Sequence, residues 1–212
     1  MGTSTMQTMP STTSGSPRPV RVAGLIALVA ALVAASSCGD AVREGTGSAF
    51  LVIDNLTASA GGSSGGVSFS NTLESDVLTK GSVFEDSGRV VVRLAPKDIT
   101  APLTSNNYVT INRYRVVFKR SDGRNTPGVD VPYAFDGAVT FNVNDERTTG
   151  NFVLVRAQAK LEPPLIQLGG NGGAIVISTL AEVTFYGTDQ TGHEVTVTGS
   201  LSVNFADWAD PQ

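Results

Sequence analysis

The sequence predicts an all-β protein, an antiparallel β-sandwich of about seven to eight strands. Apolar and polar residues alternate over short segments, as in strands with one buried face. Turn signals containing glycine or proline separate these segments, and no segment shows the spacing of an amphipathic helix. The clearest alternation runs from Glu194 to Phe205, where every odd-numbered residue except Gly199 is apolar.

The N-terminal region has the anatomy of a secretory signal. Arg18 and Arg21 precede an unbroken apolar run over residues 22–35, and small residues then lead to Cys38. A membrane-spanning helix needs about 20 apolar residues, so this run is too short to be one. We predict that residues 1–37 form a signal peptide that is removed on export.

The end of this signal resembles the lipobox of bacterial lipoproteins. Its four positions are Ala35, Ser36, Ser37 and Cys38, the only cysteine of the chain. The resemblance implies a lipid on the Cys38 sulfur and acylation of the new amino terminus; roughly two acyl chains suffice for stable anchoring. Gly39 replaces the aspartate that retains such proteins in the inner membrane, which favours the outer membrane of a bacterial cell envelope. The alternative is a plain secreted protein with an incidental thiol.

Length, charge and cysteine content indicate what kind of domain follows the signal. Residues 38–48 read as a polar tether and residues 49–212 as a single domain large enough for its own core. The formal net charge is −4, which argues against a nucleic-acid partner. With Cys38 acylated, no disulfide can form within the chain, so the domain must rely on its core and strand pairing.

The domain divides into eight strand candidates. Four acids between the second and third candidates are expected to be solvated loop residues. The architecture resembles an immunoglobulin-like sandwich, although the Cys…Trp…Cys pattern of antibody domains is missing. A helix is the alternative for residues 152–161. The candidates are Ala49–Leu56, Val67–Ser70, Arg89–Ala95, Tyr108–Arg120, Ala138–Val143, Phe152–Ala159, Ile175–Tyr186 and Glu194–Phe205, and the acids are Glu74, Asp76, Glu85 and Asp86.

A basic stripe marks the middle strand. Arg113, Arg115 and Lys119 share one face of the predicted strand, while apolar residues share the other. One interpretation is a binding surface for an anionic partner. The alternative, which antiparallel sheets favour, is a solvent face whose positive charges oppose acids on neighbouring strands.

The connection over residues 125–135 is a candidate binding loop. It contains two prolines and therefore crosses between sheets or follows an edge. Asp130, Tyr133 and Phe135 are its candidate binding residues, because rigid loops on a β scaffold often carry function. Tyr133 and Phe135 are also expected to close one end of the core.

The sequence offers no catalytic set. His193 is the single histidine and lies at a predicted hairpin turn; Ser200 and Ser202 follow on the polar face of the next strand. Zinc would need several histidine or cysteine ligands, and no calcium-loop pattern is present. Acids for a two-carboxylate glycosidase exist, but their separations are unknown from sequence. We therefore predict no catalytic residues, no metal site and no cofactor.

These observations favour a lipid-anchored, non-enzymatic envelope protein that binds a protein or glycan, or serves a structural role in the envelope. The membrane is its expected partner through Cys38. An envelope hydrolase directed at carbohydrate or ester is one alternative. A carrier with a small ligand between the sheets is another, and sealed packing around Phe118, Phe141 and Phe205 would exclude it.

Overall fold

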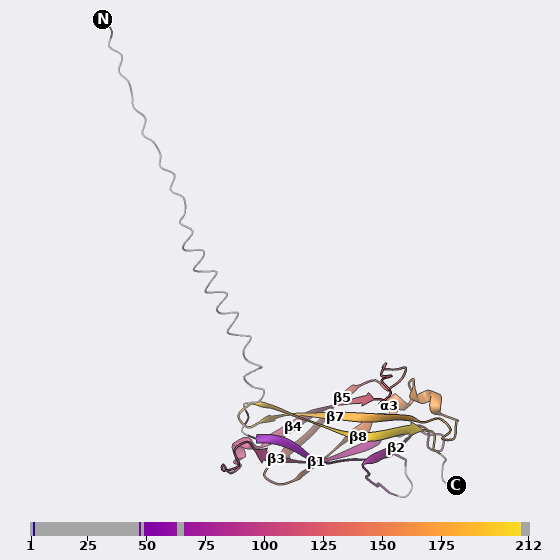
Figure 1. The fold of residues 1–212 in the computed structure, drawn as a ribbon, viewed down its shortest axis with the longest axis horizontal. Helices are drawn as coiled ribbons and strands as arrows, with labels where there is room; N and C mark the ends of the chain where they lie inside the picture. The colour runs from indigo at the N-terminus through magenta and orange to yellow at the C-terminus, as the bar shows by residue number, and fades with distance from the viewer. Residues whose placement is uncertain (1, 3–46, 48, 63–65, 209–212) are drawn as a thin grey trace. The chain divides into compact units, whose positions relative to one another are not determined.

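The computed structural model describes residues 2, 47, 49–62 and 66–208. Within these residues, three strands form one sheet in the order β1-β3-β6, and five form a second in the order β2-β8-β7-β4-β5. The two sheets pack face to face (Figure 1), which confirms the predicted all-β, sandwich-like fold. The strands are β1 (Ala49–Ser59), β2 (Thr72–Asp76), β3 (Asp86–Pro96), β4 (Val109–Lys119), β5 (Phe135–Val143), β6 (Thr148–Val155), β7 (Ile177–Asp189) and β8 (Glu194–Ala206).

The second strand differs from the prediction. Residues 67–70 form no strand and contribute one bridge, between Ala58 and Ser70. The strand lies further along, at β2, and pairs parallel to β8, so the pairing is not antiparallel throughout. Four of its five residues are polar, which obscures the alternation. The immunoglobulin-like topology stays a prediction.

Residues 152–161 contain both the predicted strand and the helix that was its alternative. The strand ends at Val155, and a short helix, α3 (Ala157–Lys160), follows it. A 3-10 turn, η2 (Leu165–Leu168), then leads towards β7, and a further one, η1 (Ser105–Asn107), precedes β4. The alternation of apolar residues continued past the true end of the strand, which is why sequence alone placed the boundary too late.

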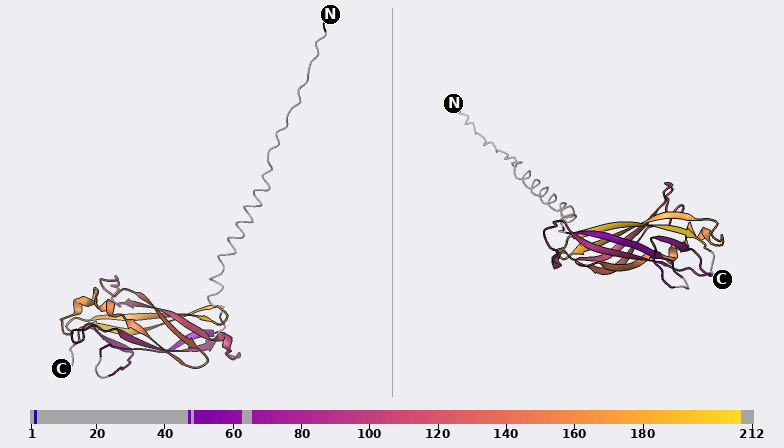
Figure 2. Two further views of the ribbon diagram at one scale, coloured as in Figure 1. Left: turned by 180° about the vertical axis from the view of Figure 1, so that it is seen from behind. Right: turned by 60° about the horizontal axis from the view of Figure 1, so that its bottom comes forward.

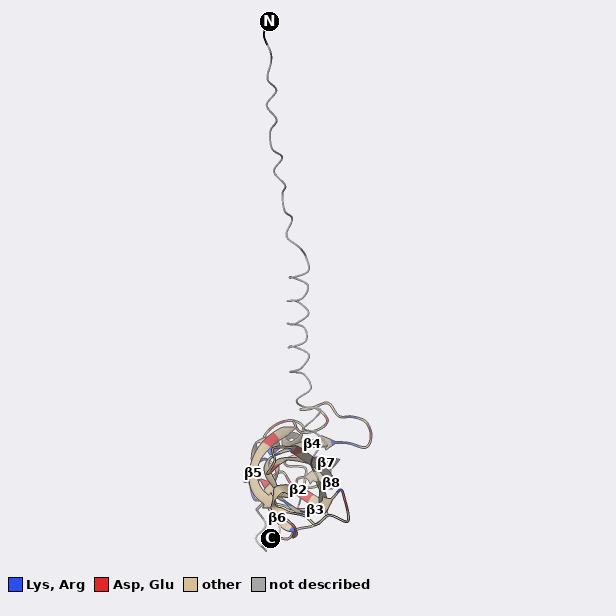
Figure 3. Cartoon of the chain, turned by 90° about the vertical axis from the view of Figure 1, so that its left-hand side faces the viewer, with Lys and Arg blue, Asp and Glu red and all other residues tan. Residues whose placement is uncertain are grey.

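The core lies between the sheets and contains the predicted inward-facing residues. Tyr114, Val116 and Phe118 of β4 are all buried. Tyr114 packs against Phe152 with ring centroids 5.1 Å apart, and Phe152 meets Phe185 edge to face at 5.2 Å. Aromatic pairs in these arrangements contribute about 0.5–1.5 kcal/mol beyond the area they bury. Figure 3 shows the strands of the two sheets from a direction close to the strand axes.

Glycines make room for the aromatic rings. A Cβ at Gly137 would lie 2.3 Å from Cζ of Tyr114, its cross-strand partner. A Cβ at Gly88 would lie equally close to the ring of its own partner, Phe152. At Gly199 the obstruction is Ile53 of the opposite sheet, at 2.8 Å.

The two ends of the sandwich carry different parts of the chain. Ala49 pairs with Pro96, and Gly47 lies next to Asp189 and Val195, so we call this end the tether end. The opposite end, which we call the far end, holds Ser59, the start of β3 and the end of β8. Figure 2 shows the two ends from further directions.

A buried charge pair joins both sheets at the far end. Lys160 Nζ donates hydrogen bonds to Asp86 Oδ1 and to the Asp76 carbonyl oxygen, both at 2.8 Å. The Ser75 hydroxyl donates to Asp86 Oδ2 at 2.6 Å, and the Gly61 N–H donates to Asp86 Oδ1 at 2.9 Å. We call these five residues the far-end clamp. It connects β3 of the smaller sheet, β2 of the larger sheet, α3 and the loop after β1.

The clamp overturns one prediction. Asp86 was expected to be a solvated loop acid, yet its side chain is 0% exposed, and that of Lys160 is 1% exposed. Burial raises the pKa of Asp86, while Lys160 and the hydrogen bonds from Ser75 and Gly61 oppose that rise. The inward alternation of Leu94, Val92 and Val90 runs back to Asp86, so its orientation could have been read from sequence.

We predict that Gly137→Ala lowers the free energy of unfolding by about 1–3 kcal/mol, because the new methyl group forces Tyr114 out of its packed position. Urea denaturation measures this change. Gly169→Ala is the control, since its nearest neighbour would be 3.5 Å away; we expect a stabilisation of less than about 1 kcal/mol. Equal effects of the two substitutions would contradict the packing described.

We also predict that Lys160→Met destabilises the protein by about 3–5 kcal/mol, because it leaves the Asp86 carboxyl buried without its partner. The matched control is Lys119→Met, which removes an exposed lysine paired with Glu182 at 2.5 Å and should cost about 0–1 kcal/mol. Chemical denaturation measures the free energy of unfolding of both variants. Similar decreases in the two variants would show that the far-end clamp stabilises the protein no more than an exposed ion pair does.

Candidate functional site

A groove lies on the outer face of the five-stranded sheet at its far end. Its volume is about 370 Å³, comparable to a small ligand pocket. Three adjacent strands supply most of its walls, and the first residues after β4 close one side. Its lining residues are Lys119, Arg120, Ser121, Ser178, Thr179, Leu180, Ser202 and Asn204.

Strand register aligns these residues. Lys119 lies opposite Leu180, and Leu180 lies opposite Ser202, so the three form a row across β4, β7 and β8. The next row pairs Ser178 with Asn204. Side chains on one face of a sheet repeat every second residue, so the polar positions of neighbouring strands necessarily meet here.

The groove offers hydrogen bonds more than charge. The hydroxyl groups of Ser121, Ser178 and Ser202 and the Asn204 amide line it and can both donate and accept, whereas the buried Thr179 hydroxyl already donates to the Val203 carbonyl oxygen. Leu180, which is 41% exposed, adds one apolar surface. The arrangement suits a ligand with several hydroxyl groups and a small apolar face.

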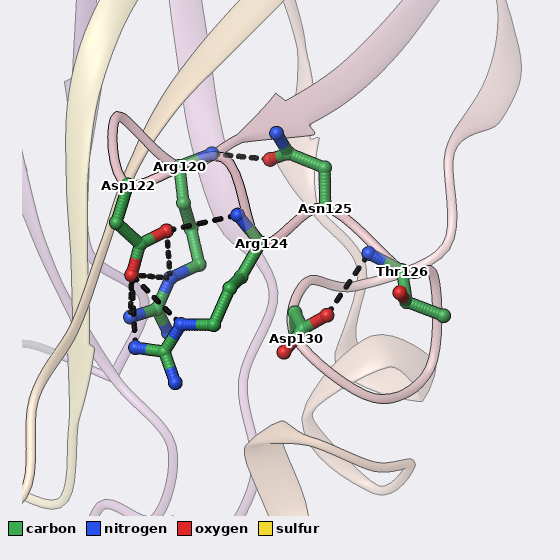
Figure 4. A network of polar contacts seen from close by, with 6 residues as sticks. All are labelled: Arg120, Asp122, Arg124, Asn125, Thr126 and Asp130. Atoms are coloured by element: carbon green, nitrogen blue, oxygen red, sulfur yellow. Dashed lines mark hydrogen bonds and ion pairs between the residues drawn. The ribbon is translucent and has the colours of Figure 1, made fainter.

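Acidic residues neutralise both cations of the groove. Lys119 pairs with Glu182, and Arg120 pairs with Asp122 at 2.7 Å. Arg124 also pairs with Asp122, at 2.8 Å, so one carboxylate holds two guanidinium groups (Figure 4). Hydrogen bonds from both arginines hold the pKa of Asp122 well below its usual range. The groove therefore carries little uncompensated charge.

Hydrogen bonds order the loop beside the groove. The Arg120 N–H donates to Asn125 Oδ1 at 2.6 Å, and the Thr126 N–H donates to Asp130 Oδ2 at 3.1 Å (Figure 4). Asp130 thus closes a turn within the loop. These contacts hold the Arg120 side of the groove in place.

The residues of the candidate binding loop lie outside this groove, and a role of the loop in binding stays a prediction. Asp130, Tyr133 and Phe135 do not line the groove. Phe135 is buried against Tyr114, as expected, with ring centroids 6.2 Å apart. Tyr133 is 52% exposed and lies over Gly128, so the prediction that it closes the core was wrong. Because Gly128 has no side chain, the Tyr133 ring can pack over it at the surface, outside the core.

The basic stripe lies on the outer face of the larger sheet, with each charge opposed by an acid. Asp136 contacts Arg115 at 2.6 Å and Arg113 at 3.6 Å. Lys119 contacts Glu182 and is the one member of the stripe that lines the groove. This geometry matches the second interpretation, in which charges on adjacent strands face each other. A role of the stripe in binding stays a prediction.

His193 lies at the tether end, in the β7–β8 turn. Its Nδ1 is 3.1 Å from Asp189 Oδ2 and 2.6 Å from the Thr191 hydroxyl. Burial would raise the pKa of Asp189, but hydrogen bonds from His193 and Thr191 outweigh it and lower that pKa overall. Ser202 is nine residues further along β8, about 30 Å away at about 3.3 Å per residue. Ser200 is about 23 Å away by the same measure, so the structure does not bring His193 and these serines together.

The described residues include neither a metal site nor a membrane-spanning helix. Among the described residues, no three histidine, cysteine, aspartate or glutamate side chains converge as a metal site would require. No helix in the described part of the chain is both long and apolar enough to cross a membrane. Cys38 and the predicted signal peptide lie outside the described residues.

Sequence reasoning did not identify the groove as a unit. The sequence places Ser202 and Asn204 on the polar face of the last strand, and it does not single out Ser178 or Leu180. The available signal was the run of polar outward positions on both strands of the predicted β7–β8 hairpin. A comparison with models of known protein families finds no match for this chain, and a comparison with curated protein sequences also finds none.

Proposed function

We propose that the protein is a lipid-anchored, non-enzymatic component of a bacterial cell envelope that binds a glycan through its far-end groove. In this proposal Cys38 carries the lipid and residues 39–48 connect it to the sandwich. The anchor rests on the signal anatomy and lipobox resemblance of residues 18–40. The absence of an aspartate at position 39 favours the outer membrane.

The observation that carries the binding proposal is the chemistry of the groove. Five of its eight lining residues carry a hydroxyl or amide group, apolar surface lies beside these groups, and both of its cations are already paired with acids. Such a site exchanges hydrogen bonds with a polyhydroxylated ligand without leaving a buried charge unpaired. A protein partner would more often need a central apolar cluster, and Leu180 is the one exposed apolar residue in the groove.

The position of the groove supports the same proposal. The chain enters the sandwich at Ala49, at the tether end. Ser202 lies eight residues beyond Glu194 along β8, about 26 Å at about 3.3 Å per residue. A groove at the far end therefore lies most of the length of the strands away from Ala49, the residue at which β1 begins.

The packing of the core favours a surface site over a ligand between the sheets. Phe118 and Phe205 meet edge to face with centroids 5.5 Å apart, and both are buried. Phe141 is partly buried and lies over Gly150, where a Cβ would come within 2.4 Å of its ring. These side chains occupy the space that a carried ligand would need.

The proposed anchor predicts that Cys38→Ala abolishes lipid attachment. In cells labelled with a palmitate analogue, the wild-type chain should be labelled and should partition into detergent, whereas Cys38→Ala should be unlabelled and water-soluble. Ser37→Ala is the control, since alanine is also accepted before the lipobox cysteine. Labelling of Cys38→Ala, or none of the wild type, would overturn the anchor and leave the groove proposal intact.

The proposed groove predicts binding on an array of neutral and acidic saccharides. We expect the full chain in detergent to retain a neutral saccharide, with affinity changing less than about twofold between about 0.1 and 1 M salt, because charge screening affects only uncompensated charges. Ser202→Leu should abolish the signal by filling the groove. Ser200→Leu is the matched control, because Ser200 lies on the same face of the same strand outside the groove.

Two results would contradict the groove proposal. Retention of no saccharide would remove its support. Equal binding by Ser202→Leu and Ser200→Leu would place the ligand elsewhere on the surface.

A further inference from the structure

We propose that the side chains of Asp86 and Lys160 condense to an intramolecular amide bond in the folded protein. Lys160 Nζ lies 2.8 Å from Asp86 Oδ1, and the two side chains are 1% and 0% exposed. A nucleophilic amine and a carboxyl group are thus held in contact, in a site from which bulk water is excluded. Reactants fixed in this way gain a large rate advantage over free groups in solution.

The reaction balances without a further reagent. Transfer of one proton from the ammonium to the carboxylate turns the ion pair into a neutral amine and a carboxylic acid. The Nζ lone pair then forms a bond to Cγ of Asp86, and the Cγ–Oδ2 bond breaks. Oδ2 leaves as water, carrying the carboxyl proton and one proton from Nζ. No group is oxidised or reduced.

The polar atoms around Lys160 can hold the neutral amine that this proton transfer produces. Two acceptors contact Nζ among the described residues, Asp86 Oδ1 and the Asp76 carbonyl oxygen. A neutral amine has two N–H bonds and satisfies both with these acceptors, whereas an ammonium ion would keep one buried N–H without a partner. Burial also raises the pKa of Asp86, which favours its protonated form.

The other members of the far-end clamp are placed to assist the reaction. The Gly61 N–H, 2.9 Å from Oδ1, stabilises negative charge that develops on that oxygen during attack. The Ser75 hydroxyl, 2.6 Å from Oδ2, can pass a proton to the departing oxygen. The product keeps two of the present contacts: the amide N–H donates to the Asp76 carbonyl, and the amide oxygen accepts from Gly61.

The amide bond would give the domain an internal covalent cross-link. The single cysteine, Cys38, leaves the domain without an internal disulfide. An amide between Asp86 and Lys160 would link residues 74 positions apart and tie β3 to α3 beside β2. Like a disulfide, a cross-link of this kind restricts the unfolded chain, but reducing agents do not cleave it.

Tandem mass spectrometry of a protease digest of the purified full chain tests the proposal. We expect the peptide containing Asp86 to be joined to the peptide containing Lys160, with a combined mass one water lower than their sum. Recovery of both peptides in linear form alone would overturn the proposal. Loss of water from the Asp86 peptide without a link would indicate a cyclic imide and would also overturn it.

Two variants sharpen the result. Lys160→Arg should yield only linear peptides, because the guanidinium is not a nucleophile in this site. Ser75→Ala should slow formation of the link by about 100-fold, the lower part of the range for a positioned proton donor. Ser87→Ala, an exposed neighbour in β3, should link as the wild type does. Equal rates in Ser75→Ala and Ser87→Ala would remove the serine from the reaction.

Discussion

The contact between Asp86 and Lys160 is the constraint on which the far end of the domain depends. A carboxyl and an amine without solvent are costly to bury, and they are tolerated here because Ser75, Gly61 and the Asp76 carbonyl satisfy them. The apolar core holds the sheets face to face but is not directional. The far-end clamp adds direction, because its hydrogen bonds fix where β2, β3 and α3 meet.

This constraint bears on the groove through β2. The clamp residues Ser75 and Asp76 belong to β2, which pairs with β8 along the edge of the groove. Glu74 accepts a hydrogen bond from the Asn204 side chain at 3.0 Å, so the same strand contacts the groove directly. A partner bound there would meet a surface whose side chains are held by strand pairing on one side and by the Asp122 network on the other. Such preorganisation lowers the entropic cost of binding.

Sequence alone could predict the long strands but not the contacts between distant segments. The alternation in β4, β7 and β8 is strong because each has an apolar face against the core. β2 escaped notice because a five-residue edge strand needs little apolar pattern once β8 supplies its hydrogen bonds. Asp86 and Lys160 are far apart in sequence, and only the folded chain shows that each is the partner of the other. The groove likewise needed the register of three strands, since no single segment contains it.

The central claim is that the far-end clamp is a fixed part of the native state. Amide hydrogen exchange of the wild-type protein at Gly61 tests it most directly, because this N–H lies in a turn and its acceptor is the Asp86 carboxyl. We predict that Gly61 exchanges as slowly as the amides of β3, which open only when the domain unfolds. Exchange at the rate of an exposed loop amide would contradict the claim.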